Sequence, residues 1–180
     1  MKYVLPVMVM LGMAVPTALH AEERKVSCLA EGIYHEARGE STDGRIGVAS
    51  VIMNRVRGWK NTVCAIVYQR SSSGCQFSWA CRAHPIKDKI VYNEALVLAK
   101  NVLSGKISDN TSGAKYFHRC GKTRGNINSD MVLTNKIGHQ CFYAPISEME
   151  YSLSTIPGEK HAKFDYSEYL WYQDGQHITG

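Results

Sequence analysis

The chain has 180 residues, of which 44% are hydrophobic and 21% are charged, and its formal net charge at pH 7 is +5. This is about one domain's worth of residues, which is enough to bury a real core. No internal repeat is present, so a repeat architecture is excluded. The modest positive charge suits an anionic polymer such as cell wall or nucleic acid, although ordinary solubility explains it as well.

The first 21 residues predict a secretory signal peptide. Lys2 carries the only formal charge before Glu22, an apolar run covers residues 3–15, and residues 18–21 form an A-x-A-like cleavage site. The run is too short and too broken for a membrane span, with an uncleaved anchor as the alternative. We therefore expect cleavage before Glu22 and an exported protein, in the periplasm or at the extracellular cell wall.

Six cysteines follow this segment, at Cys28, Cys64, Cys75, Cys81, Cys120 and Cys141. An even number of cysteines in an exported chain predicts disulfides, but the sequence does not choose among the pairings. Metal ligation is the rival interpretation. The spacing between Cys75 and Cys81 is not that of a zinc site, and C-x-x-C is absent, so we predict no metal and no cofactor.

A helix is predicted to end close to Gly39, because Leu29, Ile33 and Ala37 recur every four residues on one side. Glu36 then lies in the last turn of a mostly buried helix. The negative helix C-terminus and burial both raise the pKa of a carboxyl group, as a general acid at neutral pH requires. The alternative is a surface glutamate paired with Arg38 or a lysine.

The second predicted helix runs from about Asp43 to Arg57. Its apolar residues form one broad stripe, which is typical of a core helix: Ile46, Val48, Ala49, Ile52, Met53 and Val56. Near its end, Asn54 and Arg55 have three possible roles, namely a bridge to the first helix, a cap or a solvent contact. Residues 62–69 are apolar enough for a short buried helix or a strand.

Residues 71–74 predict a loop, and residues 75–81 alternate amide, hydroxyl and aromatic groups between two cysteines. That alternation is typical of a short strand at the wall of a groove. Amides hydrogen-bond sugar hydroxyls and N-acetyl groups, and aromatic faces cover the C–H face of a sugar ring. The alternative is a disulfide-pinned edge strand in which Phe77 and Trp79 are buried.

A third helix is predicted from Lys89 to about Leu103, with Asp88 as its cap. Strand-like runs follow at residues 114–118 and 136–143, with a polar loop between them. The sequence therefore predicts a helix-rich α+β domain with three core helices and a small irregular β region. Residues 22–143 form the expected catalytic domain, and residues 144–180 an extension that packs on it or is partly disordered.

Several chemistries are disfavoured by missing motifs. H-E-x-x-H is absent because Gly39 stands where a zincin protease needs histidine, and neither G-x-S-x-G nor a phosphate loop occurs. A cysteine nucleophile is disfavoured where every cysteine can pair. His118 and His139 remain possible ligands, proton carriers or core histidines.

Segments from Cys28 to Tyr143 resemble, in the same order, the SleB/CwlJ-type cell-wall hydrolases. They are Cys28-Leu29-Ala30, Ile33-Tyr34-His35-Glu36-Ala37-Arg38-Gly39-Glu40, Gly47-Val48-Ala49-Ser50-Val51-Ile52-Met53-Asn54-Arg55-Val56, Thr62-Val63-Cys64, Val67-Tyr68-Gln69, Cys75-Gln76-Phe77-Ser78, Gly113-Ala114-Lys115-Tyr116-Phe117-His118, and Lys136-Ile137-Gly138-His139 with Phe142-Tyr143. The family usually has a proline and a tryptophan after the aromatic-histidine strand, where this chain has residues 120–125. That departure concerns one groove wall and not the acid.

The resemblance implies a fold similar to the catalytic core of lysozymes and lytic transglycosylases. It also implies cleavage of peptidoglycan between N-acetylmuramic acid and N-acetylglucosamine, with Glu36 as the catalytic residue. Glu40 is then structural, tying the turn to the second helix, with Arg38 and Asn54 as further support. The residues expected to hold the sugars are Gln76, Phe77, Ser78, Tyr116, His118 and His139.

One acid suffices for a lytic transglycosylase. Glu36 would protonate the glycosidic oxygen and then take the proton of the muramic acid C6 hydroxyl as that oxygen attacks C1, which gives a 1,6-anhydromuramic end. A hydrolytic muramidase is one alternative. Another is a non-catalytic, exported glycan-binding or inhibitory module, although such a module would be free to lose Glu36. The expected partner is the peptidoglycan glycan strand rather than nucleic acid, and we expect a monomer.

Overall fold

The structure is a computed structural model that describes residues 17–82, 84–121 and 130–148. Most of the predicted signal peptide and of the predicted C-terminal extension lies outside the described residues. Within the described ranges, no helix combines the length and apolar character that crossing a membrane requires.

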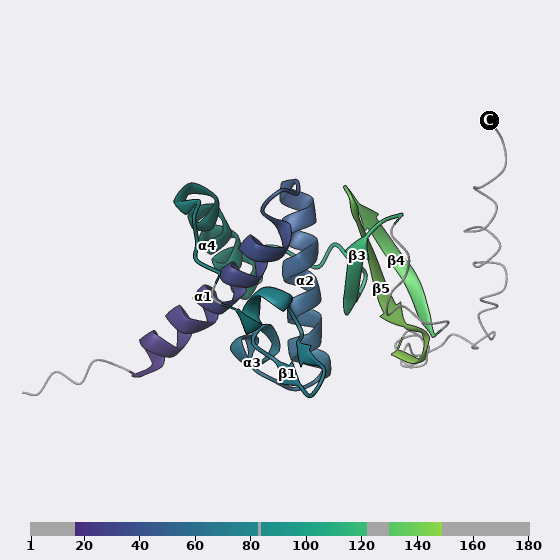
Figure 1. Cartoon of the computed structure of the whole chain (residues 1–180), viewed down its shortest axis with the longest axis horizontal. Helices are drawn as coiled ribbons and strands as arrows, with labels where there is room; N and C mark the ends of the chain where they lie inside the picture. The colour runs from purple at the N-terminus through teal and green to yellow at the C-terminus, as the bar shows by residue number, and fades with distance from the viewer. Residues whose placement is uncertain (1–16, 83, 122–129, 149–180) are drawn as a thin grey trace, which may run out of the picture.

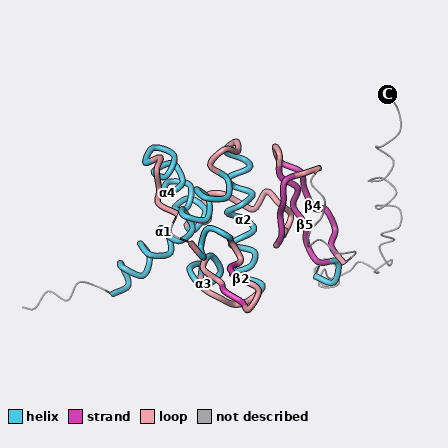
Figure 2. Tube along the Cα trace, viewed as in Figure 1, coloured by secondary structure: helices cyan, strands magenta, loops and turns pink. Residues whose placement is uncertain are grey.

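The helices are α1 (Thr17–Ala37), α2 (Thr42–Gly58), α3 (Val63–Val67) and α4 (Lys89–Leu103), with a 3-10 helix η1 at Ser78–Cys81. The strands are β1 (Arg70–Ser71), β2 (Gly74–Cys75), β3 (Tyr116–Arg119), β4 (Met131–Ile137) and β5 (Gln140–Pro145). Helices α1 and α4 lie on one side of α2, and the larger sheet lies on its other side (Figure 1). In Figure 2 the strands are confined to a small hairpin beside α3 and to this larger sheet.

Side-chain caps explain where the helices begin. Ser41 accepts a hydrogen bond from the backbone N–H of Gly44 at 3.3 Å, and Thr62 accepts one from Ala65 at 3.2 Å. Asp88 accepts bonds from the first turn of α4, at 3.0 and 3.1 Å. Each cap contributes about 1 kcal/mol to helix stability. The predicted second and third core helices are confirmed, and the apolar segment after Thr62 is a helix rather than a strand.

Helix α2 is covered by α1 on one side and by β5 on the other, and a glycine allows the close approach on each side. A Cβ atom on Gly32 of α1 would lie 2.7 Å from the Ile52 side chain, and one on Gly47 would lie 2.5 Å from the ring of Phe142 in β5. Val48 and Ile52 are fully buried, whereas Ile46, Met53 and Val56, also in the predicted stripe, are only partly buried. The core face of α2 is therefore rotated slightly from the predicted stripe.

The larger sheet is antiparallel in the order β3-β5-β4. The prediction of one strand over residues 136–143 is wrong, because the chain reverses at Gly138, whose φ is +57°. A glycine reaches this left-handed region without the steric cost that a Cβ atom imposes. Strand β4 begins at Met131, within the stretch that was predicted as a polar loop. Strand β5 runs to Pro145, which is beyond the predicted domain end at residue 143.

All six cysteines pair, which confirms the expectation of disulfides. The bonds are Cys28–Cys64, Cys75–Cys81 and Cys120–Cys141. The prediction of a strand over residues 75–81 is wrong except at its first residue. Six strand residues would span about 20 Å, whereas the two cysteine Cα atoms lie 5.6 Å apart. The segment therefore folds back into η1.

Candidate active site

Glu36 lies in the last turn of α1, as the sequence predicted, and its side chain is half-buried. Burial raises the pKa of this carboxyl group above its ordinary value, because the charged form loses water. Two neighbours act in the opposite direction, namely the indole N–H of Trp79 and the guanidinium of Arg55. The effect of burial is the largest of the three, so the carboxyl group holds its proton more tightly than an exposed glutamate.

Trp79 comes from η1 and is 8% exposed. Its ring stacks on His35 with 4.4 Å between ring centroids and on Phe77 at 6.1 Å. The buried indole Nε1–H acts on the Glu36 carboxyl group, yet it completes no hydrogen bond within ordinary limits in the described part of the chain. The sequence left two interpretations of Trp79, an aromatic residue of a groove wall or a buried residue of an edge strand, and did not connect it with Glu36. Its position next to Ser78, in the segment predicted as a groove wall, was the one signal that could have singled it out.

Arg55 lies near the end of α2 and is 3% exposed. Its Nε–H donates a hydrogen bond to the carbonyl oxygen of Lys115 at 2.6 Å, so it ties α2 to the start of β3 rather than to α1. Burial lowers the pKa of this guanidinium to about 10, although Tyr116 and Glu36 both act to raise it. The sequence offered no signal for this placement beyond the arginine itself.

Gln140 at the start of β5 connects the sheet to Glu36, because its amide Nε2–H donates to the Glu36 backbone oxygen at 3.5 Å. Several buried polar atoms of these elements have no partner. Among the described residues they include Nε1 of Trp79, Nη1 of Arg55, Oε1 of Gln140 and Nε2 of His118. Buried polar groups are nearly always hydrogen-bonded, so each of these atoms has a bond left to make.

The residues predicted to hold sugars fall in three places. Gln76 and Ser78 are exposed beside η1, and His139 is exposed on the β4–β5 turn. Tyr116 and His118 are half-buried on β3, where His118 stacks on Tyr143 with 5.1 Å between centroids. Phe77 is only 4% exposed and packs against Arg55 and Trp79, so its ring supports the wall from inside instead of facing solvent.

The three residues predicted as support make different contacts. An oxygen of Glu40 accepts a bond from the backbone N–H of His139 at 3.4 Å and lies 3.6 Å from the imidazole Nδ1. The Glu40 carboxylate therefore joins the α1–α2 turn to the β4–β5 turn. Arg38 is exposed and covers the ring of Tyr34 at 5.6 Å.

Asn54 is 6% exposed and anchors the loop that precedes β3. Its amide donates to Asp109 and to the carbonyl oxygen of Ala114, each at 2.9 Å. Asp109 also accepts a bond from the backbone of Thr111 at 2.7 Å. Asn54 therefore does not bridge to the first helix, and its contact is with the loop that leads into the sheet.

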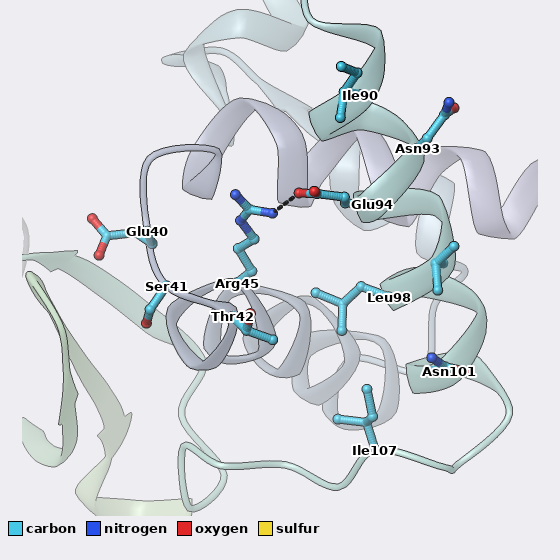
Figure 3. Close-up of a pocket in the computed structure, with 11 residues that line it drawn as sticks. Glu40, Ser41, Thr42, Arg45, Ile90, Asn93, Glu94, Leu98, Asn101 and Ile107 are labelled. Carbon is cyan, nitrogen blue, oxygen red and sulfur yellow. Dashed lines mark hydrogen bonds and ion pairs between the residues drawn. The ribbon is translucent and has the colours of Figure 1, made fainter.

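A separate hollow of about 870 Å³ lies between the start of α2 and α4. Figure 3 shows the ion pair between Arg45 and Glu94 within it, at 2.7 Å. Neither Glu36 nor any residue predicted to hold a sugar lines this hollow, although Glu40 stands at its edge. Within the described ranges, no cluster of three or more histidine, cysteine or acidic residues could hold a metal ion.

Comparison with known proteins gives one family and two similar structures. A family model described as Cell Wall Hydrolase matches residues 39–143, which is more than half of the chain and begins three positions after Glu36. The crystal structure of the catalytic domain of the Bacillus cereus SleB protein is 23% identical, with a TM-score of 0.50, and the match covers 68% of this chain and 91% of that one.

The catalytic domain of the germination-specific lytic transglycosylase SleB from Bacillus anthracis is 21% identical, also with a TM-score of 0.50. That match covers 74% of this chain and 100% of the SleB domain. No curated protein sequence matches the chain. These similarities confirm the predicted helix-rich α+β, lysozyme-like fold.

Proposed function

Because the chain belongs to the cell wall hydrolase family, we propose that it cleaves the glycan of peptidoglycan between N-acetylmuramic acid and N-acetylglucosamine, with Glu36 as its general acid. The observation that carries this proposal is the environment of Glu36. Burial raises the pKa of its carboxyl group, beside an indole N–H and a buried cation. A carboxyl group that stays protonated closer to neutral pH can donate its proton to a leaving glycosidic oxygen.

The same environment supports a single-acid reaction. A retaining glycosidase needs a second carboxylate about 5 Å from the first, and an inverting one needs a wider pair. Glu40, the other acid of the motif, binds the β4–β5 turn through His139. This favours a lytic transglycosylase over a hydrolytic muramidase.

In this reaction Glu36 acts twice. It first protonates the glycosidic oxygen as the bond to C1 of N-acetylmuramic acid breaks. The carboxylate then accepts the proton of the C6 hydroxyl while that oxygen bonds to C1, which restores the acid. The products are an N-acetylglucosamine end with a free hydroxyl group and a 1,6-anhydromuramic end, and no water is consumed.

The glycan is proposed to lie against Gln76, Ser78, Tyr116, His118 and His139. The unpartnered polar atoms of Trp79 and Gln140 provide further groups that sugar hydroxyls and N-acetyl groups can satisfy. Phe77 is not proposed to contact the glycan, because its ring is buried and supports these residues from inside.

The disulfides and the family fit an exported protein. We infer that export includes cleavage before Glu22. Such a cut would fall inside α1, where residues 19–25 are exposed and Val26 is buried, so the described side chains that it removes lie outside the core.

Mass analysis of the fragments released from purified peptidoglycan tests the reaction. We expect anhydro ends, which are lighter than hydrolysed ends by the mass of one water. Reducing ends alone would contradict the single-acid reaction and leave Glu36 as the acid of a muramidase. Binding of the glycan without any release would point to the non-catalytic module.

A further inference from the structure

Arg55 is a buried cation enclosed by aromatic rings. Its guanidinium carbon lies 5.5 Å from the ring centroid of Trp59, 5.7 Å from that of Phe77 and 5.4 Å from that of Tyr116. Contacts of this kind attract a cation electrostatically, and most strongly where the cation is desolvated. They offset part of the cost of taking this charge out of water, and they come from three separate segments of the chain.

The hydrogen bonds of Arg55 are incomplete. Its Nε–H binds the Lys115 carbonyl oxygen, but its buried Nη1 has no partner among the described residues. A tie between α2 and β3 needs only the Nε–H, and a neutral donor could supply it without burying a charge. Burying a charge and leaving one of its donors unpaired is costly, so a role in the fold alone does not explain the guanidinium.

Arg55 acts on Glu36 without forming an ion pair with it. Within the described ranges, no ion pair or hydrogen bond joins the two side chains, although each charge acts on the other. A cation in direct contact would lower the pKa of a carboxyl group by about 1–3 units and leave no proton to donate. The printed contacts link the two groups through rings: Arg55 lies over Phe77, Phe77 stacks on Trp79, and Trp79 stacks on His35, which precedes Glu36 in the chain. Without a direct contact the carboxyl group keeps a raised pKa and remains a proton donor, while the Arg55 charge favours its ionised form.

We propose that Arg55 is a positioning residue of the reaction, whose buried guanidinium stabilises the Glu36 carboxylate in the interval between proton donation and proton recovery. The proposal rests on the proposed function of Glu36. It assigns to the rings of Phe77, Trp59 and Tyr116 a second role, which is to hold this cation in place.

The other charged groups around this site do not duplicate Arg55. The Lys115 ammonium packs over Gly58 and pairs with Glu148, and Arg57 donates to the side chain of Asn54. On α1, burial lowers the pKa of His35, which favours its neutral form. Tyr116 on β3 faces Arg55. Arg55 is therefore the cation whose removal changes the charge balance at Glu36.

The test compares Arg55→Gln, which removes the charge and keeps an N–H donor, with Arg55→Lys, which keeps the charge. Arg57→Gln is the matched control, because Arg57 is an exposed arginine on the same helix. For each folded protein, glycan release from purified peptidoglycan is measured against pH. Activity falls at high pH as Glu36 loses its proton, so the position of this alkaline limb reports the pKa of Glu36.

We expect Arg55→Gln to move the alkaline limb upward by less than about one pH unit, since Arg55 makes no direct contact with the carboxyl group, and to lower kcat by less than about tenfold, because the carboxylate loses its stabilising charge. Arg55→Lys should keep the limb where it is in the wild type, and Arg57→Gln should change neither quantity. A similar loss of activity at every pH, or the same shift in Arg55→Lys, would overturn the proposal.

Circular dichroism establishes that each variant folds. If Arg55→Gln and a second neutral variant, Arg55→Met, both fail to fold while Arg55→Lys folds, the charge serves the fold and the proposal is wrong. Glu36→Gln is measured in parallel. If that variant remains active, the proposed function fails, whereas an inactive Glu36→Gln with an unshifted limb in Arg55→Gln contradicts only the role of Arg55.

Discussion

At the scale of single residues, the protonation of Glu36 is set by three opposing effects. Burial raises the pKa of the carboxyl group, while the Trp79 indole and the Arg55 guanidinium lower it. The two neighbours favour the charged form and burial favours the neutral form, with burial the stronger effect. This balance leaves a group that can donate a proton and can also exist as a carboxylate, which a residue that acts twice requires.

We expect Glu36→Gln to retain the fold and to lose at least about 10²-fold in glycan cleavage, because the amide has no proton of suitable acidity. The measurement is release of soluble fragments from peptidoglycan. Near-normal activity in this variant would contradict the assignment of Glu36 as the acid.

Glu40→Gln is the matched control, since it makes the same chemical change four positions away. Glu40 holds the β4–β5 turn through His139. This variant should therefore lose mainly stability, and any loss of activity should follow from that loss of stability. If Glu40→Gln were inactive and fully stable while Glu36→Gln cleaved normally, the two roles would be reversed.

The raised pKa of Glu36 also predicts how stability depends on pH. Folding raises this pKa above its value in the unfolded chain, so the folded state binds the proton more tightly. The stabilising contribution is therefore complete below the unfolded pKa and is lost as pH rises through the folded pKa. At pH 7, Glu36→Gln should melt at a temperature equal to or above that of the wild type, measured by thermal unfolding. A clearly lower melting temperature would mean that the carboxylate stabilises the fold.

At the scale of elements, the segment from β2 to η1 is fixed to the body by its own disulfide. Cys75 and Cys81 close a short loop that contains Phe77 and Trp79, and these two side chains reach Arg55 and Glu36 respectively. Both rings also belong to the hydrophobic core of the helices, and the Cys28–Cys64 bond joins α1 to α3. The first bond therefore fixes residues that belong both to the site and to the core, and the second joins two helices of the body.

We expect the Cys75→Ser/Cys81→Ser double variant to lose about 2 kcal/mol of stability and a larger share of its activity, because Trp79 is no longer held against Glu36. The Cys28–Cys64 bond closes a longer loop than the Cys75–Cys81 bond. The Cys28→Ser/Cys64→Ser variant should therefore lose more stability, about 4 kcal/mol, yet keep its activity at temperatures where it is folded. Denaturant unfolding and glycan release measure the two quantities. Full activity in the first variant would show that the disulfide is not needed to hold Trp79.

At the scale of the whole molecule, the helices form a body on which the sheet β3-β5-β4 packs through one face of α2 (Figure 1). The proposed site lies where these parts meet, because Glu36 belongs to α1, Arg55 to α2, Trp79 to η1 and Gln140 to β5. Three disulfides and a formal net charge of +5 suit work on an anionic wall outside the cytoplasm.

Mass spectrometry of the exported protein should show a chain that starts at Glu22 and contains no free thiol. The reasons are the signal-like residues 1–21 and the pairing of all six cysteines. A reduced, uncleaved chain recovered from the cytoplasm would contradict the prediction of export.

The sequence by itself determined the features that depend on neighbours along the chain. The starts of α2 and α4 follow from Ser41 and Asp88, because a cap acts on backbone N–H groups only two or three residues away. The position of Glu36 in a last helical turn follows from the apolar spacing before it and from Gly39 after it. The even number of cysteines was enough to predict disulfides.

Only the tertiary structure decided which distant residues meet. The cysteine pairing, the fold-back at residues 75–81 and the reversal at Gly138 were not predicted, because each depends on chain closure rather than on local pattern. The same holds for Arg55 and Trp79, which approach Glu36 from elements distant in sequence. The pKa of a carboxyl group depends on the water it loses and on the charges around it in space, and no spacing along a sequence records either quantity.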